Sequence, residues 1–258
     1  MKNMWWPGVV IVAAAVATAI GAGKDEQIHN WPAYSGDNGS TKYSPLDQIN
    51  KDTVGALQIA WRQSALPAEL KAIWPGANAP TNWQNTPLMV DGLLYMSSGV
   101  GTVVALDAAT GKVVWFDVPP HDDGKPVPRG GSTRGVAYWA NGNDSRIFAT
   151  TGPNLVALNA KTGKRYSDWG TNGSIDLTKV GYDRGAVTGY RNTSSPIVVR
   201  DVVVVGGVPV PLTDYFNEQM KATREGAPGD IRGFDAKTGR LLWTFHVVAR
   251  PGEFGEDT

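Results

Sequence analysis

Residues 104–115 read VALDAATGKVVW, and two closely similar stretches follow, VALNAKTGKRY at 156–166 and RGFDAKTGRLLW at 232–243. All three share an Asp or Asn, then Ala, any residue, Thr, Gly and a basic residue. An Asp or Asn side chain can accept hydrogen bonds from backbone N–H groups two residues on, and Gly supplies the positive φ that a tight turn needs. Each stretch therefore predicts a strand, a tight turn and a second strand.

Further strand pairs lie upstream of each turn. Residues 87–90 and 93–96 flank an Asp-Gly pair, which is typical of a tight hairpin, and similar pairs lie at 134–139 with 146–150 and at 197–199 with 202–205. Each repeat thus supplies four short strands at a period near fifty residues; the third is delayed by a charged insertion at 213–228. Four-stranded units at this period predict an all-β fold, the β-propeller, with blades at about 84–118, 134–170 and 194–248.

Aromatic residues follow two of the three turns at the same offset. Trp115 and Trp243 each lie four residues after the turn glycine, where they suit packing between neighbouring sheets. The second repeat has Ser167 at that offset, and we interpret the nearby Trp169, like Trp139, as a core residue. The repeats therefore predict two tryptophan seams.

The predicted ring is incomplete. Three full blades do not close a propeller, which needs at least four, and residues 31–62 are expected to add only an outer strand to another blade. Residues 24–258 are therefore predicted to be the N-terminal part of a larger propeller.

The first 23 residues differ from the rest. Lys2 is the only charge, residues 9–20 are apolar, and Gly21, Ala22 and Gly23 follow. This layout predicts a signal peptide or a retained N-terminal anchor, and it favours both over a buried helix. We expect an exported protein, periplasmic or in the cell envelope, with a possible membrane association through this segment.

Composition excludes several classes of function. Lys+Arg number 24 and Asp+Glu 24, so no basic balance suggests a nucleic-acid partner. The absence of cysteine excludes disulfides, thiolate metal sites, iron–sulfur clusters and covalently attached c-type haem. The three histidines are scattered without metal-ligand spacing.

The repeats resemble the tryptophan-docking repeats of quinoprotein dehydrogenases that use pyrroloquinoline quinone (PQQ). The lead-in is similar to the start of the mature domain in the glucose and alcohol branches of that family: WPAYSGD at 31–37, KYSPLDQIN at 42–50, and Ala60-Trp61. The resemblance covers almost everything after residue 23. It implies an eight-bladed propeller about twice this length, of which about three to four blades are present, with PQQ on the axis and Ca²⁺ beside it.

The resemblance also implies cofactor contacts. Arg134 matches an arginine that reaches the quinone carboxylates, for which a guanidinium fork is suited, although a surface arginine at a blade start is the alternative. Gln84 occupies a position that is often an acidic contact. Thr193 and Ser194 resemble a hydroxyl-rich run that bonds PQQ, and they are equally ordinary turn residues before Pro196.

A glycine pair, Gly206-Gly207, resembles one that lies against the cofactor ring, where a missing side chain permits approach; a strand ending in a bulge is the alternative. The family's catalytic base is an Asp beyond the region present here, so we assign no catalytic residue to this chain. The metal ligands stay unknown, with Asp214 a weak candidate for Ca²⁺.

The resemblance implies an exported dehydrogenase. The complete enzyme is expected to oxidise an alcohol or aldose hydroxyl and to pass electrons to a quinone or a cytochrome, and this chain alone is expected to be inactive. The alternative is a non-catalytic propeller scaffold of the cell envelope. A lipoprotein scaffold needs a lipid-modified cysteine, which this chain lacks.

Overall fold

The computed structural model describes residues 29–78, 83–98, 100–117, 134–182, 190, 192–207 and 229–257. The predicted signal segment at 1–23 and the insertion at 213–228, with Asp214, lie outside these residues. Within the described part the chain is nearly all β: it has twelve strands, one short α-helix and one 3₁₀ turn. None of its helices there is long and apolar enough to cross a membrane.

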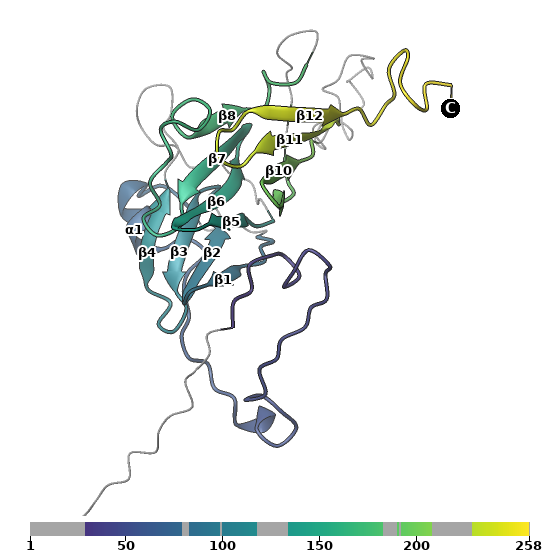
Figure 1. The fold of residues 1–258 in the computed structure, drawn as a ribbon. Coiled ribbons are helices and arrows are strands. Elements are labelled where there is room, and N and C mark those ends of the chain that lie inside the picture. Colours follow the sequence, from purple (N-terminus) through teal and green to yellow (C-terminus); the bar gives the residue numbers. More distant parts are fainter. Residues whose placement is uncertain are drawn as a thin grey trace, which may run out of the picture.

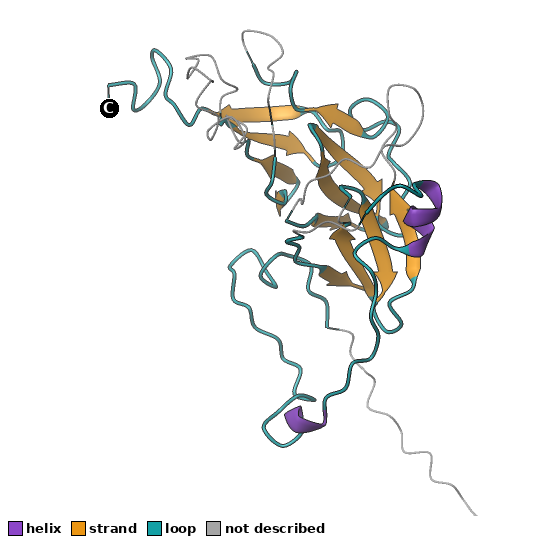
Figure 2. Cartoon of the chain, turned by 180° about the vertical axis from the view of Figure 1, so that it is seen from behind, coloured by secondary structure: helices purple, strands orange, loops and turns teal. Residues whose placement is uncertain are grey.

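The strands form three antiparallel sheets of four, each in simple meander order (Figures 1 and 2). The first holds β1 (Leu88–Val90), β2 (Leu93–Ser97), β3 (Val103–Asp107) and β4 (Val113–Asp117). The second holds β5 (Ala137–Asn141), β6 (Asp144–Thr151), β7 (Asn154–Asn159) and β8 (Ser174–Asp176). The third holds β9 (Ile197–Val199), β10 (Val202–Val205), β11 (Ile231–Asp235) and β12 (Leu241–Phe245). The helical turns are η1 (Val54–Ala56) and α1 (Ala68–Ile73), both before the first sheet.

The repeated turns form as their residues predict. In the first, Asp107 Oδ1 accepts hydrogen bonds from Thr110 N at 2.8 Å and Thr110 Oγ1 at 2.7 Å. Gly111 follows at φ +70°, and its N–H donates to the Asp107 carbonyl at 2.8 Å. Asn159 and Asp235 make the same contacts in the second and third sheets. One local sequence therefore produces one turn three times.

A tryptophan from the preceding part of the chain lies over each of the first two turns. The Trp115 indole covers Gly163, where an added Cβ would lie 2.5 Å from Trp115 Cε3, and its Nε1 donates to the Ala160 carbonyl at 2.9 Å. Trp61 covers Gly111 in the same way and donates to the Ala108 carbonyl at 2.9 Å. Each turn thus receives the tryptophan that precedes it in the chain.

The second sheet uses a tryptophan at a different offset from the other two repeats. Trp169, rather than a residue four positions after Gly163, packs on the next turn: it is fully buried and lies 3.1 Å from an added Cβ on Gly239. The chain leaves the turn through an irregular loop, with Gly170 and Gly173 at positive φ, before β8 begins at Ser174. The fourth strand therefore falls beyond residue 170. Trp169 is a core residue, as its sequence context predicts, and it also docks on the neighbouring turn.

The hydrophobic core lies between the sheets. One buried cluster joins the first and second sheets around Trp115 and Ile147, and a second joins the second and third sheets around Trp169 and Phe234. Trp139 is buried as predicted, and its Nε1 donates to Asp201 Oδ1 at 2.9 Å across the second seam. The lead-in projects from the first sheet as a long, mostly exposed loop (Figure 1), and its residues 57–62 belong to no described sheet.

Candidate functional site

The segments that precede β1, β5 and β9 are hydrogen-bonded to one another. Thr86 N donates to the Arg134 carbonyl at 3.2 Å, and Arg134 N donates to the Thr193 carbonyl at 3.1 Å. These two hydrogen bonds form a short backbone ladder that joins the segments before the three sheets. The ladder therefore brings together residues that lie far apart in the sequence, with Arg134 between the segments of Gln84 and Thr193.

A glycine makes this close approach possible. Gly135 has φ +151°, and a Cβ added there would lie 3.2 Å from the Thr86 carbonyl oxygen and 3.5 Å from Ser195 Cβ. A side chain at this position would press on both neighbouring segments. The Arg–Gly pair thus has a structural basis: the glycine packs the three segments, and the arginine before it is held by its backbone on both sides.

The Arg134 side chain is exposed. Within the described part of the chain, its guanidinium makes no hydrogen bond or ion pair. A fixed backbone that carries a free guanidinium fork is suited to binding a planar carboxylate, because two parallel N–H groups can meet its two oxygens.

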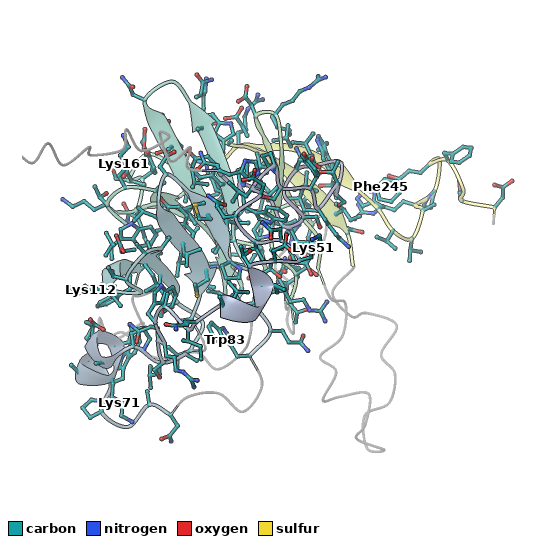
Figure 3. All side chains as sticks on the ribbon, turned by 90° about the horizontal axis from the view of Figure 1, so that it is seen from below. Lys51, Lys71, Trp83, Lys112, Lys161 and Phe245 are labelled. Atoms are coloured by element: carbon teal, nitrogen blue, oxygen red, sulfur yellow. The ribbon has the colours of Figure 1, made fainter. Side chains whose placement is uncertain are left out.

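Gln84 lies two residues before Thr86, in the segment that bonds to the Arg134 carbonyl. It is exposed, and its neighbours tie the segment to the end of β2: Trp83 Nε1 donates to the Ser97 carbonyl at 3.1 Å, and Asn85 Nδ2 donates to it at 3.0 Å. Figure 3 labels Trp83 on this part of the molecule. The position of Gln84 is therefore set by its flanking side chains.

On the other side of Arg134, Thr193 is partly buried and Ser194 is exposed. Asn192 Oδ1 accepts a hydrogen bond from Ser194 N at 3.0 Å, and Asn192 Nδ2 donates to the Gly206 carbonyl at 2.6 Å. The hydroxyl pair and the glycine pair therefore lie side by side, as parts of one small structure.

The two glycines differ in their surroundings. A Cβ on Gly206 would meet nothing within 4 Å, whereas one on Gly207 would lie 2.4 Å from Tyr190 Cε2. The Tyr190 ring therefore occupies the space that Gly207 leaves, and only Gly206 keeps an open face. The pairing of β10 with β9 and β11 runs without a register shift as far as Val205, the residue before the glycine pair.

Tyr190 also fixes this region through its hydroxyl, which donates to the Gly206 carbonyl at 3.2 Å. Burial raises the pKa of Tyr190, so the hydroxyl stays protonated as a donor. The buried Arg232 guanidinium lies over the ring at 5.0 Å from its centroid and donates to the Leu177 carbonyl at 2.8 Å. Sequence reasoning did not single out Tyr190 or Asn192, because neither belongs to a recurring pattern.

An apolar cavity of about 270 Å³ lies between the lead-in and the first sheet. Its described lining includes Trp61, Trp83, Pro87, Met96 and Leu106, and carries no charged side chain. The cavity therefore offers shape and apolar contact but no acid or base. Nor do the described residues bring together three His, Asp or Glu side chains that could hold a metal ion.

The described site therefore offers anion and hydroxyl contacts without a base or a metal cluster. A family description, PQQ: glucose/ethanol/alcohol dehydrogenase, β-propeller domain, matches residues 31–258. The chain belongs to this family. The predicted family and its propeller fold are both confirmed, and the three described sheets are part of such a propeller.

Known proteins of the family resemble most of this chain. The dehydrogenase subunit of the quinone alcohol dehydrogenase of Gluconobacter oxydans (strain 621H) is 31% identical over 225 residues, which cover 86% of this chain and 25% of that protein. Quinoprotein glucose dehydrogenase A of Acinetobacter calcoaceticus is 31% identical over 249 residues, covering 87% and 29%. The chain thus spans between a quarter and a third of these relatives.

Two solved dehydrogenase structures also superpose on most of this chain. The quinohemoprotein alcohol dehydrogenase of Comamonas testosteroni superposes with a TM-score of 0.59 at 26% identity, covering 87% of this chain and 28% of that one. A europium-containing methanol dehydrogenase superposes with a TM-score of 0.55 at 27% identity, covering 84% and 32%.

Proposed function

We propose that this chain is part of an exported PQQ-dependent dehydrogenase that oxidises an alcohol or aldose hydroxyl and passes the electrons to a quinone or a cytochrome. Family membership supports the cofactor class, and the names of the relatives support both substrate classes. The observation that carries the proposal is the Arg134 ladder, which presents a free guanidinium beside two hydroxyl-bearing residues and an open glycine.

The described residues fit a planar quinone that bears carboxylates. The Arg134 fork would pair with a carboxylate, the hydroxyls of Thr193 and Ser194 would donate hydrogen bonds to ring substituents, and Gly206 would let the ring edge approach the backbone. Gln84, in the segment before β1, would add a polar contact. When bound, PQQ supplies the two-electron acceptor of the reaction.

The remaining parts of the reaction belong outside these residues. We assign no catalytic base to this chain and name no Ca²⁺ ligand, since the described residues bring together no three His, Asp or Glu side chains. Residues 1–23 would serve as the export signal or membrane anchor, which agrees with a periplasmic or envelope location. By itself the chain is proposed to hold part of the cofactor site without turnover.

A binding experiment tests this assignment. PQQ is titrated into the 258-residue chain and followed by quenching of tryptophan fluorescence. We expect Arg134→Ala to weaken binding about tenfold or more, because a hydrogen bond to a charged group contributes roughly 1.5–3 kcal/mol. Arg240→Ala is the matched control: it removes an exposed arginine at the opposite end of the third sheet.

Three outcomes of this experiment contradict the proposal. Absence of PQQ binding by the unaltered chain argues against the cofactor site and favours a scaffold role. Equal affinities for the Arg134→Ala and Arg240→Ala chains argue against the assigned anion contact. In a dye-reduction assay with PQQ, Ca²⁺ and alcohols or sugars, robust turnover by the chain alone would overturn its proposed inactivity.

A further inference from the structure

Two buried side chains join the segment before β9 to the end of β10. Asn192, only 8% exposed, donates from Nδ2 to the Gly206 carbonyl at 2.6 Å and accepts from Ser194 N at 3.0 Å. Tyr190 donates to the same carbonyl at 3.2 Å. The Gly206 carbonyl therefore receives two side-chain donors from one short stretch of chain.

Asn192 uses both ends of its amide, and this restricts which side chain could replace it. Nδ2 must donate to the Gly206 carbonyl while Oδ1 accepts from Ser194 N, so one short side chain must reach both groups. Aspartate has the same shape but lacks the donor when ionised, and alanine lacks both groups. The link is therefore specific to an amide of this length.

The first sheet contains a comparable link. Asn85 lies before β1, and its Nδ2 donates to the carbonyl of Ser97, the last residue of β2. In both sheets, an asparagine that precedes the first strand is bonded to the end of the second. These two segments lie at the two ends of the backbone ladder through Arg134. The asparagines thus hold the ladder from both sides.

Displacement of Asn192 would be transmitted to Arg134. The Thr193 carbonyl, the next along the chain, accepts the hydrogen bond from Arg134 N at 3.1 Å. Asn192 orients the Ser194 amide on one side and the Gly206 carbonyl on the other, so it sets the relative positions of all these groups. It does so from a buried position, without contacting the open face at Gly206.

We propose that Asn192 is a positioning residue for the binding ledge formed by Arg134, Thr193, Ser194 and Gly206. The inference rests on the proposed function, because the ledge is the surface that would receive the PQQ carboxylates and ring edge. Asn192 would hold the ledge in its binding geometry before PQQ binds. Binding would then cost less conformational entropy.

The test begins with the unliganded chain. Amide hydrogen exchange at Ser194 should accelerate at least about fivefold in Asn192→Ala, because the acceptor for this N–H is lost, and stay nearly unchanged in Asn192→Asp, which keeps an acceptor. The matched control is Asn50→Ala. Asn50 Oδ1 accepts from Asp52 N and Thr53 N in the lead-in, so its loss should leave Ser194 exchange unaffected.

Affinity for PQQ supplies the second readout. At pH 7 we expect Asn192→Ala and Asn192→Asp to bind PQQ about five- to tenfold more weakly than the unaltered chain, and Asn50→Ala to bind it equally well. Asn192→Asp should recover as the pH is lowered, because a protonated carboxyl can again donate to the Gly206 carbonyl. Because burial at this position should raise the pKa of the introduced aspartate, the recovery should begin at a pH above its ordinary pKa of about 3.9.

Recovery is measured as the ratio of the variant's dissociation constant to that of the unaltered chain at the same pH. A ratio that falls toward one only for Asn192→Asp supports the inference. If the unaltered chain binds PQQ and both variants match it, the inference is wrong while the proposed function stands. If the unaltered chain does not bind PQQ, the proposed function fails first, and the inference fails with it.

Discussion

At the scale of single residues, the turn glycines of the three repeats, Gly111, Gly163 and Gly239, each make room for a tryptophan ring. Gly163 combines φ +69° with an indole so close that an added Cβ would lie 2.5 Å from Trp115 Cε3. Gly142 has a similar φ of +60° in the β5–β6 hairpin, but nothing lies within 4 Å of its added Cβ. Alanine at Gly142 would therefore introduce backbone strain alone, whereas alanine at Gly163 would add a clash with the Trp115 ring.

Replacing both glycines measures the two costs. Gly142→Ala should lower the free energy of unfolding by about 1–2 kcal/mol, the cost of a left-handed conformation for an ordinary residue. Gly163→Ala should lower it by a further 1–3 kcal/mol or so, because the methyl group displaces the Trp115 ring. Urea unfolding of the two variants gives the difference, and equal losses would show that the ring adjusts at no cost.

At the scale of elements, the β–turn–β units depend on one side chain each. Hydrogen bonds from Thr110 hold the pKa of Asp107 below its usual value. Burial alone would raise the pKa of Asp235, but hydrogen bonds from Thr238 and Lys237 together lower it. The second unit uses Asn159, which accepts from Thr162 without a titrating group. The molecule therefore contains its own comparison between a charged and a neutral turn.

This comparison predicts how the turns respond to acid. A carboxyl whose folded pKa is depressed stabilises the fold above the unfolded pKa of about 3.9, and that contribution is lost as pH falls through the folded pKa. The melting temperature of a chain with both Asp107→Asn and Asp235→Asn should therefore fall less between pH 6 and pH 3 than that of the unaltered chain. Near pH 6 the two melting temperatures should be similar. Parallel thermal melts check this, and identical acid losses would contradict it.

Elements of this kind could be predicted from the sequence because their determinants are local. The Asp91-Gly92 hairpin forms with both residues at positive φ, and the three turns form at their repeated motif. The docking of Trp169 could not be predicted, because an irregular loop carries it to Gly239 from an unexpected offset. Tyr190 and Asn192 were equally unpredictable, since their partner at Gly206 is defined only when strand β10 ends beside them.

At the scale of the whole molecule, the seams determine how sheets stack. The first seam includes an ion pair between Arg165 and Asp117 at 2.8 Å, and the second has Arg146 donating to the Ala236 carbonyl at 3.1 Å. The third sheet presents a different surface. Phe245 stands two residues after Trp243, as Asp117 does after Trp115, and Figure 3 shows it at the far side of the molecule from Lys112. The face of the third sheet that carries Trp243 and Phe245 is therefore apolar at the position where the first seam has the Asp117 carboxylate.

The difference in exposure between Trp115 and Trp243 predicts different effects when each is replaced by alanine. Trp115 is buried and Trp243 is 41% exposed, so Trp115→Ala should lower the free energy of unfolding by about 3–5 kcal/mol and Trp243→Ala by less than about 1 kcal/mol. Phe245 is 60% exposed beside it, and an apolar face of this kind favours association between molecules. Light scattering should therefore show less self-association for Trp243→Ala than for the unaltered chain. Equal destabilisation by the two substitutions would mean that Trp243 is already packed in solution, because only a docked indole leaves a cavity when it is removed.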